Sequence, residues 1–108
     1  METDNQSTPF EKAMAGIAVE RQYQNLKWGS PNASGPHSVA EWLLIIESEL
    51  AEAKDGWVDH GGERRALEEL VQVAAVAVAA LEQHGVYHEQ KHLNYLFENT
   101  GDSDDYRK

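Results

Sequence analysis

The sequence contains no cysteine, few basic residues and no proline beyond Pro36. The absence of cysteine excludes a disulfide scaffold, an iron–sulfur cluster, a thiolate zinc site and a cysteine nucleophile. Only 9 Lys and Arg residues stand against 19 Asp and Glu residues, which gives a net charge of −10. This charge repels nucleic-acid polymers and anionic membranes, so neither is an expected partner.

Long hydrophobic runs are also absent. No apolar stretch approaches the ~20 residues of a membrane-spanning helix. The start of the chain, Met1 to Pro9, is polar and acidic, which is not the pattern of a secretory signal. A chain of 108 residues is long enough for one small domain. We therefore expect a single-domain cytoplasmic protein.

The residues that are abundant after His37 are helix formers, namely Ala, Leu, Glu and Gln, and no alternating strand pattern is present. The pattern predicts an all-α fold of the four-helix-bundle type. The expected helices cover residues 10–26, 38–54, 63–83 and 87–97. They form one helical domain over residues 10–97, between a flexible N-terminus (1–9) and an acidic flexible tail (98–108).

Individual residues mark the expected helix ends. Pro9 suits a first helical position, and Ser38 with Glu41 has the spacing of a capping box. Gly56 and Gly85 are expected to terminate the second and third helices. Trp57 then falls in the short connection between these two helices.

The third predicted helix is apolar on every side. Between Leu70 and Leu81 the only polar residue is Gln72. A helix of this kind is buried all round, and one short chain offers too few partner helices for that. We therefore expect self-association as a homodimer or a dimer of dimers.

Acidic residues recur on the second and third predicted helices. Glu49 and Glu52 lie three residues apart beside the apolar face of the second helix, and Glu69 and Gln72 have the same spacing at the start of the third. If these helices pack antiparallel, three carboxylates and one amide converge. Such convergence raises a pKa or requires a cation. Hard oxygen ligands favour Mg²⁺ or Mn²⁺, and Mg²⁺ commonly shares phosphate oxygens with its protein ligands. Glutamates at this spacing are also common on solvated helix surfaces, so solvation is the alternative.

These acidic pairs resemble those of the MazG-like nucleoside triphosphate pyrophosphohydrolases, of the all-α NTP pyrophosphatase superfamily. Members carry Glu-Glu-x-x-Glu and, after a gap, Glu-x-x-Asp. Here Ser48 to Glu52 matches the first half and Glu69 to Gln72 the second, with the 16 residues 53–68 between them. The segment from Arg21 to Gly29 resembles a small branch of this family found partly in phages and mobile elements.

The resemblance implies hydrolysis of a nucleoside triphosphate between the α and β phosphates, with Glu49, Glu52 and Glu69 as the catalytic and metal-binding set. Gln72 stands where the family has aspartate, and Ser48 where it has the first glutamate. Gln72 still offers a carbonyl oxygen to the metal, without charge. Asp55, one turn beyond Glu52, is a candidate substitute. Either Glu49 or Glu52 could instead act as a general base.

Further residues are candidates for substrate binding. Lys27 and Trp28 place a cation beside an aromatic plane that could stack on a base. Trp42 shares the stripe of Glu49 and could wall the pocket, while Lys54 and Arg65 could hold phosphate oxygens. The alternatives are packing for the tryptophans, and solvation or a surface ion pair for the cations.

Three histidines recur at intervals of four residues, His84, His88 and His92, at and within the last predicted helix. This spacing could bind zinc or nickel. A solvent-facing stripe is the expected alternative.

Three functions stay open on the sequence. The first is a pyrophosphohydrolase that prefers a purine such as dGTP and acts in nucleotide-pool control or house-cleaning. The second is an enzyme of the same superfamily acting on dUTP, dCTP or a (p)ppGpp-like substrate. The third is a helical interaction module whose catalysis has weakened, for which Ser48 and Gln72 are the main indications.

Overall fold

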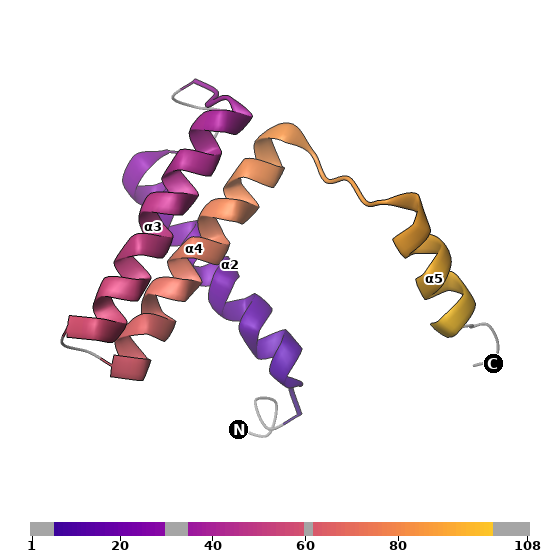
Figure 1. Ribbon diagram of the computed structural model, residues 1–108, viewed down its shortest axis with the longest axis horizontal. Helices are drawn as coiled ribbons and strands as arrows, with labels where there is room; N and C mark the ends of the chain where they lie inside the picture. The colour runs from indigo at the N-terminus through magenta and orange to yellow at the C-terminus, as the bar shows by residue number, and fades with distance from the viewer. Residues whose placement is uncertain (1–5, 30–34, 60–61, 101–108) are drawn as a thin grey trace.

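The computed structural model describes residues 6–29, 35–59 and 62–100. These residues form four α-helices and no strand, which confirms the all-helical prediction (Figure 1). In chain order they are α2 (Pro9–Trp28), α3 (Val39–Asp59), α4 (Gly62–His84) and α5 (Gln90–Thr100).

Capping boxes begin the first two helices. At α2 the backbone N–H of Glu11 donates to Oγ1 of Thr8 and the N–H of Thr8 donates to Oε1 of Glu11, both at 3.0 Å, with Pro9 in the first turn. Ser38 and Glu41 make the same two bonds before α3, at 2.7 and 3.1 Å. The predicted box at Ser38 is confirmed, and α2 begins within the segment that was expected to be flexible.

The prediction that Gly56 ends the second helix is wrong. The helix α3 continues through Gly56 and Trp57 to Asp59, so Trp57 does not lie in a connection. A Cβ atom at Gly56 would lie 2.9 Å from Cγ of Arg65 on α4. The absence of a side chain at Gly56 therefore allows Arg65 to approach α3 closely. Gly85, with φ of 101°, follows the last residue of α4 as predicted.

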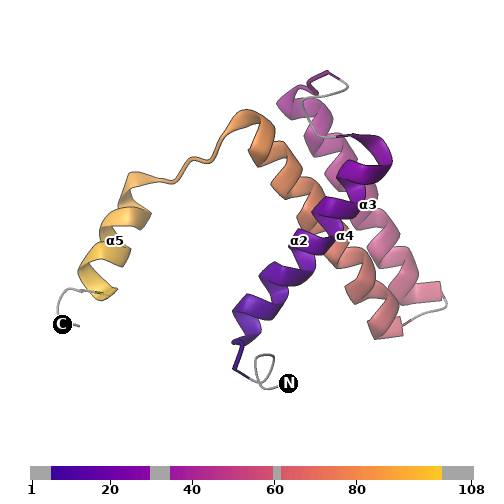
Figure 2. The same cartoon turned by 180° about the vertical axis from the view of Figure 1, so that it is seen from behind.

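Three of the helices form the packed body of the molecule. α3 and α4 run antiparallel side by side, and α2 crosses α4 obliquely (Figures 1 and 2). α4 packs against both neighbours, whereas the backbones of α2 and α3 do not meet. The core contains Trp42, Val76 and Ala79, flanked by partly buried isoleucines on α3. A space between α2 and α3 is therefore left above α4.

The helix α5 lies apart from the other three in both views, and it packs against none of them. Its residues are all exposed, including Leu93, Tyr95, Leu96 and Phe97. It begins three residues later than predicted, at Gln90. The packed body of the described residues is thus a three-helix arrangement with α5 outside it, and the predicted completion of a bundle by a second copy stays a prediction.

This arrangement also corrects the predicted histidine stripe. His84 is the last residue of α4, His88 lies in the connection and His92 is on α5. The three side chains therefore do not share one helix face.

The apolar helix α4 is buried on one side only. Ala75, Val76 and Ala79 are buried, but Leu70 and Leu81 are 49% and 46% exposed. As expected, the described part of one chain does not bury this helix all round, and α5 does not cover it. Cover by a second copy stays a prediction. None of the described helices is long and apolar enough to cross a membrane.

Candidate metal centre and the adjoining cleft

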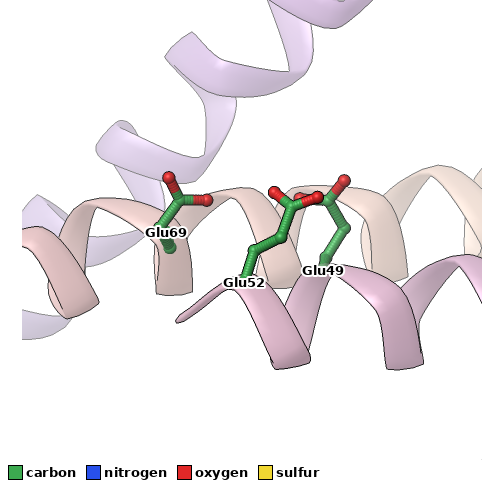
Figure 3. Close-up of side chains that lie close together, drawn as sticks. All are labelled: Glu49, Glu52 and Glu69. Carbon is green, nitrogen blue, oxygen red and sulfur yellow. The ribbon is translucent and has the colours of Figure 1, made fainter. Parts of the chain in front are cut away.

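Three carboxylates meet where α3 and α4 lie side by side. Glu49 and Glu52 are one turn apart on α3, and Glu69 is on α4. One oxygen atom of each lies within 4.8 Å of the others, and the three side chains turn to the same side (Figure 3). The antiparallel packing that the sequence suggested is what brings them together.

Two of the three carboxylates are largely removed from solvent, whereas Glu52 is exposed. Glu69 is only 9% exposed, and Glu49 is half-buried. Oε1 of each is buried and accepts no hydrogen bond from the described residues. Arg65 is the one described cation at the cluster, and its Nε lies 3.4 Å from Oε2 of Glu69. A buried oxygen that accepts no hydrogen bond is destabilising, so these atoms fit a cation that would complete the site.

The electrostatics of the cluster act most strongly on Glu49. Its pKa is raised, first by burial of the carboxylate and then by the negative charges of Glu52, Glu69 and Glu20. Glu20 belongs to α2, so the third helix of the body also presents a carboxylate to this region.

A cleft of about 670 Å³ adjoins the carboxylates. One wall is α2, the opposite wall is α3, and α4 forms the floor. The residues that line it from α2 and its C-terminal end are Glu20, Arg21, Tyr23, Gln24, Asn25, Lys27, Trp28 and Gly29. Those that line it from the rest of the chain are Gly35, His37, Trp42, Ile45, Glu49, Gln72, Val76 and Ala79. Glu49 and Gln72 therefore face the same space as the C-terminal half of α2.

The end of α2 supplies an aromatic and cationic corner to the cleft. Nζ of Lys27 lies 5.1 Å from the ring centroid of Trp28 and 5.7 Å from that of Tyr23. Trp28 is 61% exposed. This exposure rules out the alternative that Trp28 is a core residue, and it leaves an open ring face for a planar ligand.

Trp42 combines the two roles weighed for it. It is buried in the core and also lines the cleft. Its indole N–H donates to Oε1 of Gln83 at 2.6 Å, and its ring meets that of His37 edge-on at 4.9 Å. The cleft wall at this point is therefore fixed by packing and by a hydrogen bond.

A buried arginine holds α2 on α4. Arg21 is 6% exposed and pairs with Glu82 through two bonds of 2.8 Å. Two further N–H groups donate to Oε1 of Gln24 and Oδ1 of Asn25, at 3.2 and 3.0 Å. Because guanidinium only donates, both amides must turn their oxygen atoms toward Arg21. Both residues line the cleft, and their NH₂ groups, which are the donors left to them, make no hydrogen bond among the described residues.

The other predicted residues are not drawn into the cleft. Lys54 and Asp55 are exposed and are not among the residues that line it. Arg65 pairs with Glu69, as in the ion-pair alternative, and so borders the carboxylates. Sequence reasoning did not select Glu20 or Gln24. The signal in the sequence was the run of mostly polar residues 20–25. A helix that packs against a neighbour must bury one face, so some of these polar side chains had to face inward.

Comparisons with models of protein families, with curated proteins and with solved structures found no match.

Proposed function

We propose that this protein is a metal-dependent nucleotide pyrophosphohydrolase of the MazG-like type. The observation that carries the proposal is the pair of buried, unpartnered oxygens of Glu49 and Glu69, which converge with Glu52 beside a cleft. Polar groups left in this state indicate a ligand of opposite charge. Oxygen donors alone favour Mg²⁺ or Mn²⁺ over softer metals.

Glu49, Glu52 and Glu69 would hold the cation, and Gln72 offers an uncharged oxygen from the floor of the same cleft. When bound, Mg²⁺ or Mn²⁺ would neutralise phosphate charge and increase the electrophilicity of phosphorus. It would also reconcile an anionic substrate with a chain of net charge −10.

The dimensions of the cleft suit a nucleoside triphosphate. Glu20 and Trp28 line the α2 wall eight residues apart, which is about 12 Å along a helix. A base stacked on Trp28 would therefore direct its phosphates toward the carboxylates. Lys27 beside this ring adds a cation near the sugar and phosphate positions.

The orientation of two amides supports a guanine base. Gln24 and Asn25 direct their oxygens to Arg21, so their NH₂ groups are the donors that they can offer a ligand. Guanine presents two neighbouring acceptors, O6 and N7, whereas adenine presents a donor beside N7. dGTP is therefore the substrate that we expect to be preferred.

The test is hydrolysis of a panel of dNTPs and NTPs with Mg²⁺ or Mn²⁺, with pyrophosphate and orthophosphate resolved as products. We expect monophosphate and pyrophosphate from dGTP, lost in Glu49→Gln and Glu69→Gln but retained in Glu47→Gln. Glu47 is the matched control because it is exposed on the same helix and lies outside the cluster.

The alternatives give different results. Preferential turnover of dUTP, dCTP or (p)ppGpp would keep the reaction class and reject the assigned base. No turnover of any nucleotide with either metal would overturn the proposal and favour a helical interaction module. In that case Gln72→Asp is expected to restore activity.

We further propose that the chain assembles as a homodimer or a dimer of dimers. The exposed leucines of α4 and the exposed aromatic residues of α5 are an unusual amount of apolar surface for a small monomer. Sedimentation equilibrium gives the assembly state directly. A monomer at micromolar concentration would contradict this part of the proposal.

A further inference from the structure

Glu20 lies on the α2 wall of the cleft, opposite Glu49 on the α3 wall. It is half-buried, and it makes no ion pair or hydrogen bond with the described residues. Its neighbour Arg21 cannot neutralise it, because that guanidinium is committed to Glu82, Gln24 and Asn25. Glu20 is thus a carboxylate held toward a cleft that already contains acidic groups.

The rotation of α2 explains why Glu20 faces inward. Gln24, one turn further along the same face, is 8% exposed. Arg21 lies beside Glu20 on the neighbouring stripe of α2, and its ion pair with Glu82 fixes the rotation of the helix about its axis. The negative charge of Glu20 consequently acts on Glu49 across the cleft.

The oxygens of Glu49, Glu52 and Glu69 lie within 4.8 Å of one another, and Glu20 is outside this group, on the facing wall of the cleft. We propose that Glu20 moves in as a fourth carboxylate when a divalent cation binds, so that a cation bound by Glu49, Glu52 and Glu69 also joins the α2 wall to the α3 wall. The backbones of these two helices do not touch. Oε2 of Glu69 pairs with Arg65, but Oε1 is buried and accepts no hydrogen bond from the described residues, which supports a cation at this place. The inference rests on the metal-binding part of the proposed function and extends it to α2.

This role has a physical rationale in the charge of the site. The three clustered carboxylates have only Arg65 as a described cationic neighbour, and Gln72 brings no charge. A fourth carboxylate increases attraction for a small divalent cation and costs repulsion when the cation is absent. Metal binding would then draw α2 and α3 together, and metal removal would loosen the docking of α2.

The experiment titrates the full-length protein with Mn²⁺ alone, without nucleotide, and follows loss of the free Mn²⁺ electron paramagnetic resonance signal. We expect Glu20→Gln to weaken Mn²⁺ binding about 10-fold or more. Glu47→Gln removes the same charge from an exposed position on α3 and should leave the affinity unchanged. Glu69→Gln should abolish binding.

A second measurement separates ligation from misfolding. Mn²⁺ should raise the melting temperature of the wild-type protein, and this increase should shrink in Glu20→Gln but persist in Glu47→Gln. Without metal, Glu20→Gln should melt no lower than the wild type, because it removes repulsion.

Equal Mn²⁺ affinity in Glu20→Gln and Glu47→Gln, with loss in Glu69→Gln, would overturn the role of Glu20 and leave the proposed function intact. No Mn²⁺ binding by the wild-type protein would instead overturn the metal centre itself. A lower metal-free melting temperature in Glu20→Gln would also contradict the inference, because it would show a structural role.

Discussion

Arg21 on α2 and Glu82 on α4 form a two-pronged ion pair, with Nε–Oε2 and Nη2–Oε1 both at 2.8 Å. Arg21 is 6% exposed, whereas the side chain of Glu82 is 44% exposed. The pair joins the crossing helix to the helical hairpin, and it also orients the amides of Gln24 and Asn25. It is therefore the main polar attachment of the α2 wall of the cleft.

Arg21→Ala should lower the free energy of unfolding by about 2–3 kcal/mol, because it removes charged hydrogen bonds and leaves Gln24 without its donor. Urea unfolding followed by circular dichroism measures this change. Arg64→Ala is the matched control, since Arg64 pairs with Glu68 at the exposed surface. That change should stay within about 0.5 kcal/mol of zero. Similar losses in both variants would contradict the structural role of Arg21.

Glu49 should destabilise the metal-free protein at neutral pH. Its pKa is raised in the folded state, so the folded protein binds the proton more tightly than the unfolded chain does. Stability therefore falls as pH rises from the ordinary glutamate pKa through the raised value. Glu49→Gln should melt higher than the wild type at pH 7, and the difference should vanish below the ordinary glutamate pKa.

Addition of Mn²⁺ should reverse this order at pH 7, because only the wild-type carboxylate can bind the cation. Thermal melts across a pH series, with chelator or with Mn²⁺, test both signs. If Glu49→Gln melts at a lower temperature than the wild type in chelator at pH 7, the negative charge of Glu49 does not destabilise the folded protein.

Gly56→Ala should be destabilising although alanine is the better helix former. The added Cβ would lie 2.9 Å from Cγ of Arg65. In an Arg65→Ala background that atom is absent, so Gly56→Ala should become stabilising by up to about 1 kcal/mol. Gly16 on α2 has no atom within 4 Å of an added Cβ, so Gly16→Ala should stabilise the unmodified protein. The urea midpoints of Gly56→Ala, Arg65→Ala, the double variant and Gly16→Ala test whether the effect of Gly56→Ala changes sign when Arg65 is removed. A stabilising Gly56→Ala in the unmodified protein would contradict this prediction.

Trp28→Ala should weaken nucleotide binding and leave stability nearly unchanged. The ring is 61% exposed at the cleft, and loss of a base-stacking aromatic costs about 1–3 kcal/mol of binding. We expect Kd for dGMP to rise about 10-fold or more, measured by calorimetry. Trp57→Ala is the control, because Trp57 is 58% exposed on α3 and does not line the cleft. Equal affinity in both variants would exclude stacking on Trp28.

The sequence allowed the helical class, most helix ends and the meeting of Glu49, Glu52 and Glu69 to be predicted. These depend on local signals, namely caps, helical spacing and a short connection. The prediction that Gly56 ends its helix was wrong because a glycine can either end a helix or make room for a neighbouring side chain. The sequence does not show which neighbour approaches.

The contribution of α2 to the site could not be read from the chain. Glu20 and Gln24 look like surface residues, because their burial depends on how α2 crosses α4. That crossing is set by Arg21 and Glu82, which are 61 residues apart in the chain. The separation of α5 was equally hidden, since its length and polarity are ordinary for a packed helix.

The isolation of α5 among the described residues has a thermodynamic consequence for the proposed self-association. A helix of 11 residues is too short to be stable alone in water, and none of the other described helices covers its leucines and aromatic rings. If the proposed self-association covers these side chains, formation of α5 and assembly are one coupled equilibrium. Dilution should melt this helix first, while the hairpin of α3 and α4 persists, so the helical content of the protein becomes a function of its concentration.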